Sequence, residues 1–243
     1  MIGSIVNIFN IILYQPLLNV LVLLYLYLPG SDFGLAVISL TIIIKLILYP
    51  LGVKSIRSQR DLAALQPKIK ELQNKYKDNK EQQTKEIMSL YKTEGINPFS
   101  GCLPLLIQLP ILLALYRVFW VSFDASQAHL LYSFVKVPEV FNTTFLGIVD
   151  LSSPNIILAI LAGVFQFIQI KTSMPKIKPG KSLNTSEKMQ KQMQFFMPAF
   201  MVIILLNLPS AIGLYWVTTT IFTIGQQYMI FKKINIEKQE GLK

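Results

Sequence analysis

The chain has 243 residues, of which 52% are hydrophobic and 15% are charged, and its formal net charge is +10. The charged fraction is well below the quarter that is usual in soluble domains, which indicates a helical membrane protein. The single cysteine, Cys102, excludes an intramolecular disulfide framework and a CxxC metal site, and we interpret the single histidine, His129, as a surface residue of an outer loop. The sequence has no nucleophile elbow, no paired-histidine zinc motif and no glycine-rich phosphate loop, so we expect neither an enzyme nor a cofactor.

Residues 1–33 are apolar but are interrupted by polar side chains such as Asn10, Gln15 and Asn19. No basic residue precedes Lys45, so the positive region of a signal peptide is missing. We interpret this stretch as an amphipathic helix that lies in the outer interface of the membrane, with a sixth span as the alternative.

Residues 34–53 are long and apolar enough to cross a bilayer as the first span. Lys45 lies inside this run, where a charge costs at least about 2.5 kcal/mol and usually faces a wet cavity. Lys45 therefore marks a candidate functional site, and the alternative is a lysine whose side chain snorkels to the cytosolic headgroups. Thr41 precedes it by one helical turn and shares its face.

Residues 54–100 are rich in basic side chains, and their apolar residues recur at helical spacing on both sides of the turn at Asp78-Asn79-Lys80. We expect two antiparallel helices that form a charged cytosolic hairpin, with a bend or restart at Pro67. The basic surface either faces water and lipid headgroups or docks a partner, and the sequence leaves both open. The candidate docking residues are Arg57, Arg60, Lys68 and Lys70.

Four more apolar runs follow, and with the first they predict five transmembrane helices in an all-α protein. The expected segments are a second span at 101–123, an outer loop at 124–154, a third span at 155–171, a cytosolic loop at 172–193, a fourth span at 194–208, a fifth span at 209–231 and a short tail at 232–243.

The basic residues are unevenly distributed among the connections. They concentrate in 54–100, 172–193 and 232–243, whereas 124–154 carries few. The positive-inside rule therefore places these three basic segments in the cytosol, with the N-terminus outside and the C-terminus inside. This distribution explains the net charge without nucleic-acid recognition.

Several polar residues lie inside the predicted spans. Gln108, Gln166, Gln169 and the threonines at 218–220 either join helices or line one wet concavity together with Lys45. No span contains an acidic partner for Lys45, which leaves a cation available for a visiting anion. Arg117 lies near the outer end of the second span, where it snorkels to the interface or provides a second charge in the concavity.

Motifs distributed along nearly the whole chain resemble those of one known family. They include Tyr14-Gln15-Pro16-Leu17, Thr41-Ile42-Ile43-Ile44-Lys45-Leu46-Ile47-Leu48-Tyr49-Pro50-Leu51, Leu65-Gln66-Pro67-Lys68-Ile69, Gly101-Cys102-Leu103-Pro104-Leu105-Leu106-Ile107-Gln108-Leu109-Pro110 and Leu208-Pro209-Ser210-Ala211-Ile212-Gly213-Leu214-Tyr215-Trp216. In this order the motifs resemble the YidC/Oxa/Alb family of membrane-protein insertases.

The resemblance implies five spans around a hydrophilic groove that is open to the cytosol and the lipid and closed on the outside. The groove residues that it implies for binding a client are Lys45, Gln108, Tyr215 and Trp216, with Thr41 beside the cation. We add Thr219 from the polar residues inside the predicted spans. The family usually has arginine where this chain has Lys45, so the charge is kept but the bidentate fork is lost.

The implied function is that of an insertase and folding chaperone in the bacterial cell membrane, which inserts short-tailed membrane proteins alone or with the Sec channel. The expected partners are nascent membrane proteins and membrane lipids, with the Sec translocon, the ribosome and a targeting receptor as candidates. The residues themselves leave one alternative, a small anion transporter or channel that uses Lys45 as its anion site.

Overall fold

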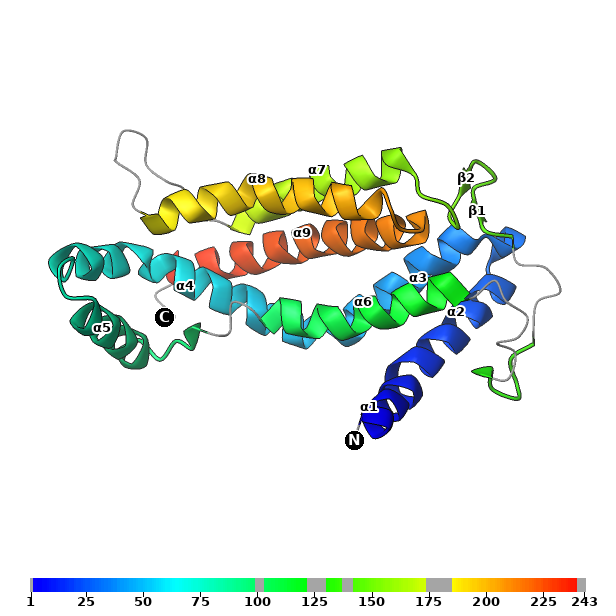
Figure 1. The fold of residues 1–243 in the computed structure, drawn as a ribbon, viewed down its shortest axis with the longest axis horizontal. Helices are drawn as coiled ribbons and strands as arrows, with labels where there is room; N and C mark the ends of the chain where they lie inside the picture. Colours follow the sequence, from blue (N-terminus) through cyan, green and yellow to red (C-terminus); the bar gives the residue numbers. More distant parts are fainter. Residues whose placement is uncertain (1, 99–102, 122–129, 137–141, 174–184, 240–243) are drawn as a thin grey trace.

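The computed structural model describes residues 2–98, 103–121, 130–136, 142–173 and 185–239, so Cys102 and His129 lie outside the described residues. The described part is an elongated helical bundle (Figure 1). Helices α4 and α5 form one end of it, here called the hairpin end, and strands β1 and β2 lie at the other, here called the strand end. Helix α9 runs along the bundle between the α7–α8 layer and the α3–α6 layer.

The N-terminal segment is helical throughout, from α1 (Ile2–Phe9) through the π-helical turn η1 (Asn10–Tyr14) to α2 (Gln15–Tyr27). It crosses the bundle obliquely (Figure 1). The part from Val6 to Tyr27 is long and apolar enough to cross a membrane. Length and composition therefore do not decide whether this segment spans the membrane or lies in its interface. The interfacial position stays a prediction.

Helix α3 (Phe33–Ile47) follows the short 3-10 turn η2 (Pro29–Ser31), and the Asp32 side chain caps α3 by accepting the amide of Leu35 at 2.8 Å. The helix ends at Leu48, and α4 (Tyr49–Lys75) leaves it at an angle of 69°. Pro50 lies in the first turn of α4, where its missing N–H needs no helical partner. The segment 34–53, which the sequence predicts as the first span, is therefore bent before Pro50, and its role as a span stays a prediction.

Helix α4 is followed by α5 (Lys80–Thr93), in the region where the sequence predicts a helical hairpin. The Asn79 side chain caps α5 by accepting the amide of Gln82 at 3.0 Å, and Gln83 Nε2 donates to the carbonyl of Gln73 across the pair. The predicted restart at Pro67 is wrong, because α4 continues through this residue. Pro67 removes one backbone hydrogen bond without ending a helix that is otherwise intact on both sides.

The other long helices are α6 (Leu103–Val121), α7 (Ile156–Ser173), α8 (Thr185–Leu205) and α9 (Ser210–Gln239). Helix α7 is by itself long and apolar enough to cross a membrane, whereas the apolar parts of α6 and α8 are shorter. The structure is thus that of a mostly helical protein with apolar candidate spans.

A two-stranded antiparallel sheet interrupts the all-helical pattern that the sequence predicts. Strand β1 (Thr144–Phe145) pairs with β2 (Val149–Asp150), with Phe145 opposite Val149. The ring of Phe145 packs against Gly34 so closely that a Cβ there would lie 2.0 Å from Cδ2 of the ring. The amide of Leu146 donates to Asp32 Oδ2 at 2.5 Å, so these contacts fix the sheet to the start of α3.

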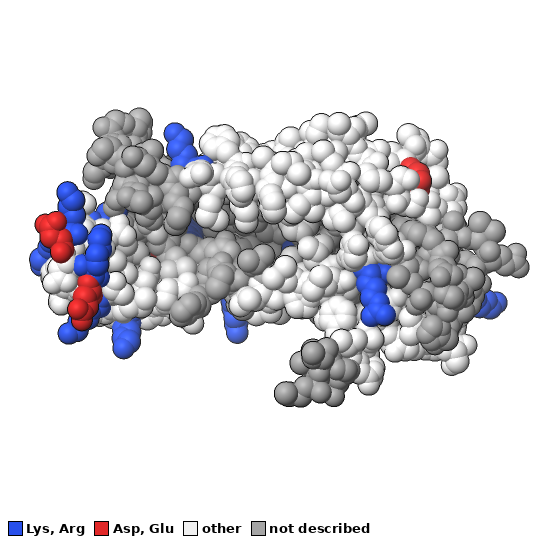
Figure 2. Space-filling model, in the orientation of Figure 1, with Lys and Arg blue, Asp and Glu red and all other residues white. Residues whose placement is uncertain are grey.

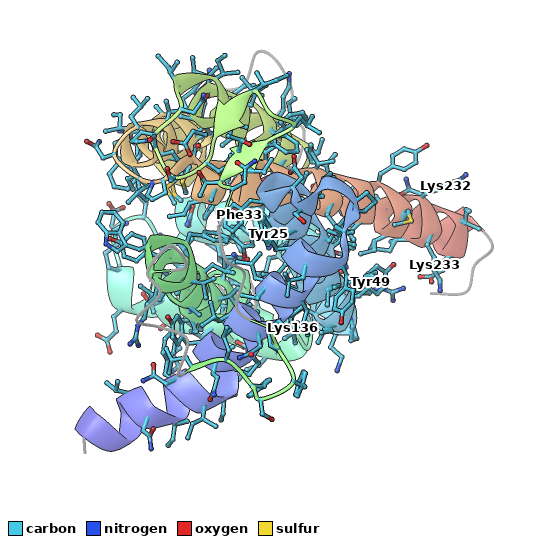
Figure 3. All side chains as sticks on the ribbon, turned by 90° about the vertical axis from the view of Figure 1, so that its right-hand side faces the viewer. Tyr25, Phe33, Tyr49, Lys136, Lys232 and Lys233 are labelled. Atoms are coloured by element: carbon cyan, nitrogen blue, oxygen red, sulfur yellow. The ribbon has the colours of Figure 1, made fainter. Side chains whose placement is uncertain are left out.

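The apolar core lies towards the strand end, where α2, α3, α6 and α9 meet. Tyr25, Phe33 and Phe119 are buried and form a chain of edge-to-face ring contacts, with centroids 6.4 Å and 6.1 Å apart. Figure 3 shows Tyr25 and Phe33 next to each other at the junction of α2 and α3. Aromatic packing closes this end of the bundle, and the polar side chains between the helices lie further along it.

Candidate functional site

A cavity of about 280 Å³ lies between α3, α4, α6, α7 and α9, and is here called the polar cavity. Most of the side chains that line it carry an amide or a hydroxyl, and a few apolar ones complete it. Its lining consists of Lys45, Leu48, Leu51, Gly52, Ser55, Ile56, Gln59, Ile107, Gln108, Gln166, Gln169, Trp216, Thr219, Thr220, Thr223, Gln226 and Gln227. Lys45 is the only charged residue in this set.

Lys45 lies in the last turn of α3, and its Nζ donates to Thr223 Oγ1 of α9 at 3.2 Å. Among the described residues, no carboxylate lies within 4.0 Å of it. This contact directs the amine towards α9 inside the cavity, which favours the cavity interpretation over a snorkelling lysine. A half-buried cation that is held by a neutral hydroxyl can attract an incoming anionic group, because it is screened less than a charge in bulk water.

Gln108 and Tyr215 are brought together, as are Trp216 and Gln166. Gln108 Nε2 donates to the Tyr215 hydroxyl, and Trp216 Nε1 donates to Gln166 Oε1. These bonds connect α9 to α6 on one side and to α7 on the other. Gln108 and Trp216 line the polar cavity, whereas Tyr215 is 2% exposed and lies behind the lining.

The two threonines among the predicted groove residues have different surroundings. Thr219 lines the polar cavity one turn before Thr223. Thr41 does not, because it is 1% exposed and its hydroxyl donates to the carbonyl of Val37 at 2.6 Å. Thr41 is thus part of the packing around α3 in this structure, although it shares a helix with Lys45.

Several cavity residues were not predicted from the sequence, above all Gln226 and Gln227 of α9. Gln226 Nε2 donates to the carbonyl of Tyr49 at 3.2 Å. Gln227 accepts from the Thr172 hydroxyl at 2.9 Å and donates to the Ser173 hydroxyl at 2.6 Å, which joins α9 to the end of α7. Adjacent glutamines in an apolar run are the sequence signal that could have found them. Ser55 and Gln59 had no such signal, because only the bend at Leu48 brings α4 to the cavity.

The predicted docking residues of the hairpin divide into two pairs. Arg57 Nη2 lies 3.5 Å from Glu237 Oε1, and Arg60 donates to the carbonyl of Phe231 at 3.2 Å and to Asn235 Oδ1 at 2.6 Å. Both arginines therefore hold α4 against α9. Lys68 is exposed and pairs with Glu94 at 2.5 Å within the hairpin itself. Lys70, further along α4, is half-buried. Docking of a partner by these four residues stays a prediction.

The polar cavity lies beside Tyr49, close to where α4 turns away from α3, and the dense charge of the molecule lies beyond it. Figure 2 shows most of the blue and red surface of this view at the hairpin end, while the bundle is mostly white. Apolar side chains such as Leu113, Ile157 and Ile203 are half or more exposed on α6, α7 and α8. An apolar outer surface around a polar interior is the arrangement expected of a protein that is surrounded by lipid.

Comparison of the sequence with known proteins identifies the family of this chain. Residues 24–239 match the sequence profile of the family described as 60Kd inner membrane protein. Proteins named membrane protein insertase YidC from Francisella tularensis subsp. novicida (strain U112) and subsp. tularensis (strain SCHU S4 / Schu 4) are 38% identical over 200 residues, which is 82% of this chain and 32% of each relative. The chain thus spans about a third of the length of these relatives. It belongs to the 60Kd inner membrane protein family, which confirms the resemblance that its motifs carry.

Proposed function

We propose that this chain is a membrane-protein insertase and folding chaperone, whose clients are nascent membrane proteins with short translocated tails. The observation that carries the proposal is the polar cavity, which holds Lys45 as its one charged side chain inside an apolar helical bundle. The relatives at 38% identity are named insertases, which supports the same activity here. The cavity serves as the client-binding part of a groove.

The mechanism follows from the cost of moving polar groups through lipid. A charged tail loses its hydration in the bilayer at a cost of a few kcal/mol for each charge. A hydrated cavity shortens the dry part of this path, and Lys45 attracts the anionic groups of the tail. The client's apolar segment, about 20 residues for one span, then moves into lipid and drives the step forward. The proposed steps take their energy from the transfer of the apolar segment into lipid and require no nucleotide hydrolysis.

The membrane arrangement that we propose has five spans, with the N-terminus outside, the hairpin end in the cytosol and the strand end outside. The concentration of charge at the hairpin end supports this orientation (Figure 2). The N-terminal helix then lies in the outer interface. Cysteines placed at the exposed positions Asn79 and Ile148 test the arrangement, because a membrane-impermeant maleimide should label Asn79→Cys only from the cytosolic side and Ile148→Cys only from outside. Labelling of both from one side would overturn it.

The charged hairpin gives the candidate partners a place to bind. Lys68 and Lys70 form part of a basic surface that could receive the Sec translocon, the ribosome or a targeting receptor, whereas Arg57 and Arg60 contact α9. No partner is needed for the insertion step itself in this proposal, so the purified protein alone should insert a suitable client.

Insertion by purified protein in proteoliposomes tests the role of Lys45. The client has one span and a short acidic N-terminal tail, and a second client with a neutral tail serves as the control. Lys45→Arg should insert the acidic-tailed client as well as the original chain does, because the charge is retained. Lys45→Glu should reduce it about tenfold, which corresponds to about 1.4 kcal/mol of lost attraction. If Lys45→Glu inserts the acidic-tailed client normally, the attraction mechanism is wrong.

The alternative function is that of a small anion transporter or channel, because an uncompensated lysine beside a hydroxyl also suits an anion. The two functions differ in what crosses the membrane without a client. We expect no anion conductance from purified protein in client-free proteoliposomes. A steady anion conductance that Lys45→Glu abolishes would favour the channel and overturn the insertase.

A further inference from the structure

Arg117 of α6 is a second cation on the apolar bundle, and the proposed insertion mechanism does not use it. It is exposed and does not line the polar cavity. Arg117 follows Gln108 by nine residues, which places it about 14 Å further along α6, away from the hairpin end. Leu113 and Trp120 lie on the same helical face as Arg117, and each is 60% exposed.

The guanidinium of Arg117 is held in place by two residues of η1. Its Nη1 donates to Asn10 Oδ1 at 2.6 Å, and its Cζ lies 4.5 Å above the centre of the Tyr14 ring. Both partners come from the π-helical turn, a geometry that is rare and often found at functional sites. An amide oxygen and an aromatic ring orient the guanidinium but do not neutralise its charge.

Within the described part of the chain, no carboxylate lies within 4.0 Å of the Arg117 guanidinium. The surface around the guanidinium is instead apolar and aromatic. Tyr116 and Trp120 stack with their ring centroids 5.7 Å apart, and both are exposed. Such amphipathic aromatic pairs are typical of the level at which lipid headgroups begin.

We propose that Arg117, Asn10 and Trp120 form a binding site for the phosphate of an anionic phospholipid, whose acyl chain lies along Leu113. The planar guanidinium presents several donors and matches the two free oxygens of a phosphodiester. A headgroup without an ammonium group, such as that of phosphatidylglycerol, binds most strongly because it brings no competing cation. In the proposed orientation the site lies in the outer leaflet. The site requires only that the chain is embedded in lipid, so its failure would leave the insertase proposal intact.

Fluorescence quenching of Trp120 by brominated lipids tests the site. The chain has two tryptophans, so Trp216→Phe leaves Trp120 as the only tryptophan, whose emission is excited selectively over that of tyrosine. This background is reconstituted in mixtures of phosphatidylglycerol and phosphatidylcholine, in which one or the other lipid carries bromine on its acyl chains. We expect Trp120 to show about a fivefold preference for phosphatidylglycerol, as one cation near a membrane surface provides. Arg117→Gln should abolish the preference, and Arg117→Lys should retain part of it.

Two further variants distinguish a built site from a general effect of charge. Lys54→Gln removes an equal charge from an exposed position on α4 and should leave the preference of Trp120 unchanged. Asn10→Ala keeps the charge of Arg117 but removes the acceptor that orients it, and should lower the preference. If Asn10→Ala has no effect, or if Arg117→Gln keeps the fivefold preference, the proposed site is wrong.

Discussion

The polar cavity and the α4–α5 hairpin use charge in opposite ways. The cavity contains Lys45 as its one charged residue among neutral amides and hydroxyls, whereas the hairpin carries many charges on an exposed surface. A charge that is partly shielded from water interacts over several ångströms with little screening, while an exposed ion pair contributes about 0–1 kcal/mol. One substitution should therefore matter greatly in the cavity and little in the hairpin.

The largest effect is expected when the charge of the client's tail is changed. A single lysine can attract one or two acidic groups, but each further charge on the tail adds a transfer cost of a few kcal/mol. Insertion of a single-span client by the purified protein should therefore fall more than tenfold with each additional aspartate beyond the second. A client series with zero to five aspartates in a tail of constant length measures this. Uniform insertion across the series would indicate a continuous aqueous pore.

The next largest expected effect is the difference in client insertion between a charge reversal in the polar cavity and one in the hairpin. Lys45→Glu should reduce insertion of the acidic-tailed client about tenfold. The double variant Lys68→Glu and Lys70→Glu changes the net charge twice as much, yet should change insertion by the purified protein less than about twofold. The reason is that both residues lie outside the lining of the polar cavity, and water screens the exposed Lys68. Equal losses in the two variants would show that overall charge, and not the cavity, attracts the client.

Substitution of a hairpin residue that contacts α9 should lower the free energy of unfolding more than substitution of one that pairs only within the hairpin. Arg60→Ala removes two hydrogen bonds and a contact between the guanidinium and the Phe231 ring, whose centroid is 5.2 Å away. We expect it to lower the free energy of unfolding by about 1–2 kcal/mol, because these groups are only partly exposed. Lys68→Ala removes an exposed pair and should change it by less than about 0.5 kcal/mol. Unfolding of both variants in mixed detergent micelles provides the measurement.

The smallest effect concerns Asp150, the last residue of β2, outside the helices. Hydrogen bonds from Thr143 and from the backbone of Ser152 lower the pKa of this carboxyl to about 2. Because the folded pKa is below the ordinary value of 3.8, the carboxylate stabilises the fold above that value and ceases to do so as the pH falls towards 2. Hydrogen exchange of the Ser152 amide should therefore accelerate between about pH 4 and pH 2 relative to the intrinsic rate. Asp150→Asn should remove this acceleration at low pH. If the acceleration persists in the variant, a group other than Asp150 causes it.

Local patterns in the sequence were sufficient for much of the architecture. The two helical stripes and the turn at Asn79 predicted the hairpin, because helix capping and periodicity act within a few residues. The apolar runs predicted a helical membrane protein, and the motifs around Lys45, Gln108 and Trp216 indicated the family. Lys45 itself stood out because a charge in an apolar run is costly wherever the helix packs.

The tertiary structure decided which side chains meet. Gln226 reaches Tyr49 across 177 positions of the chain, and Arg60 reaches Asn235 across 175, and no periodicity within one segment reports such pairs. Thr41 and Lys45 share a helical face by spacing, yet Thr41 is buried in packing while Lys45 reaches the cavity, because α3 contacts its neighbours differently along its length. The sequence by itself determined the helices, the hairpin and the single charge among them. Only the bend at Leu48 and the packing of α4 and α7 on α9 gathered the amides around that charge, since convergence of distant segments depends on how the helices pack and not on the pattern of any one of them.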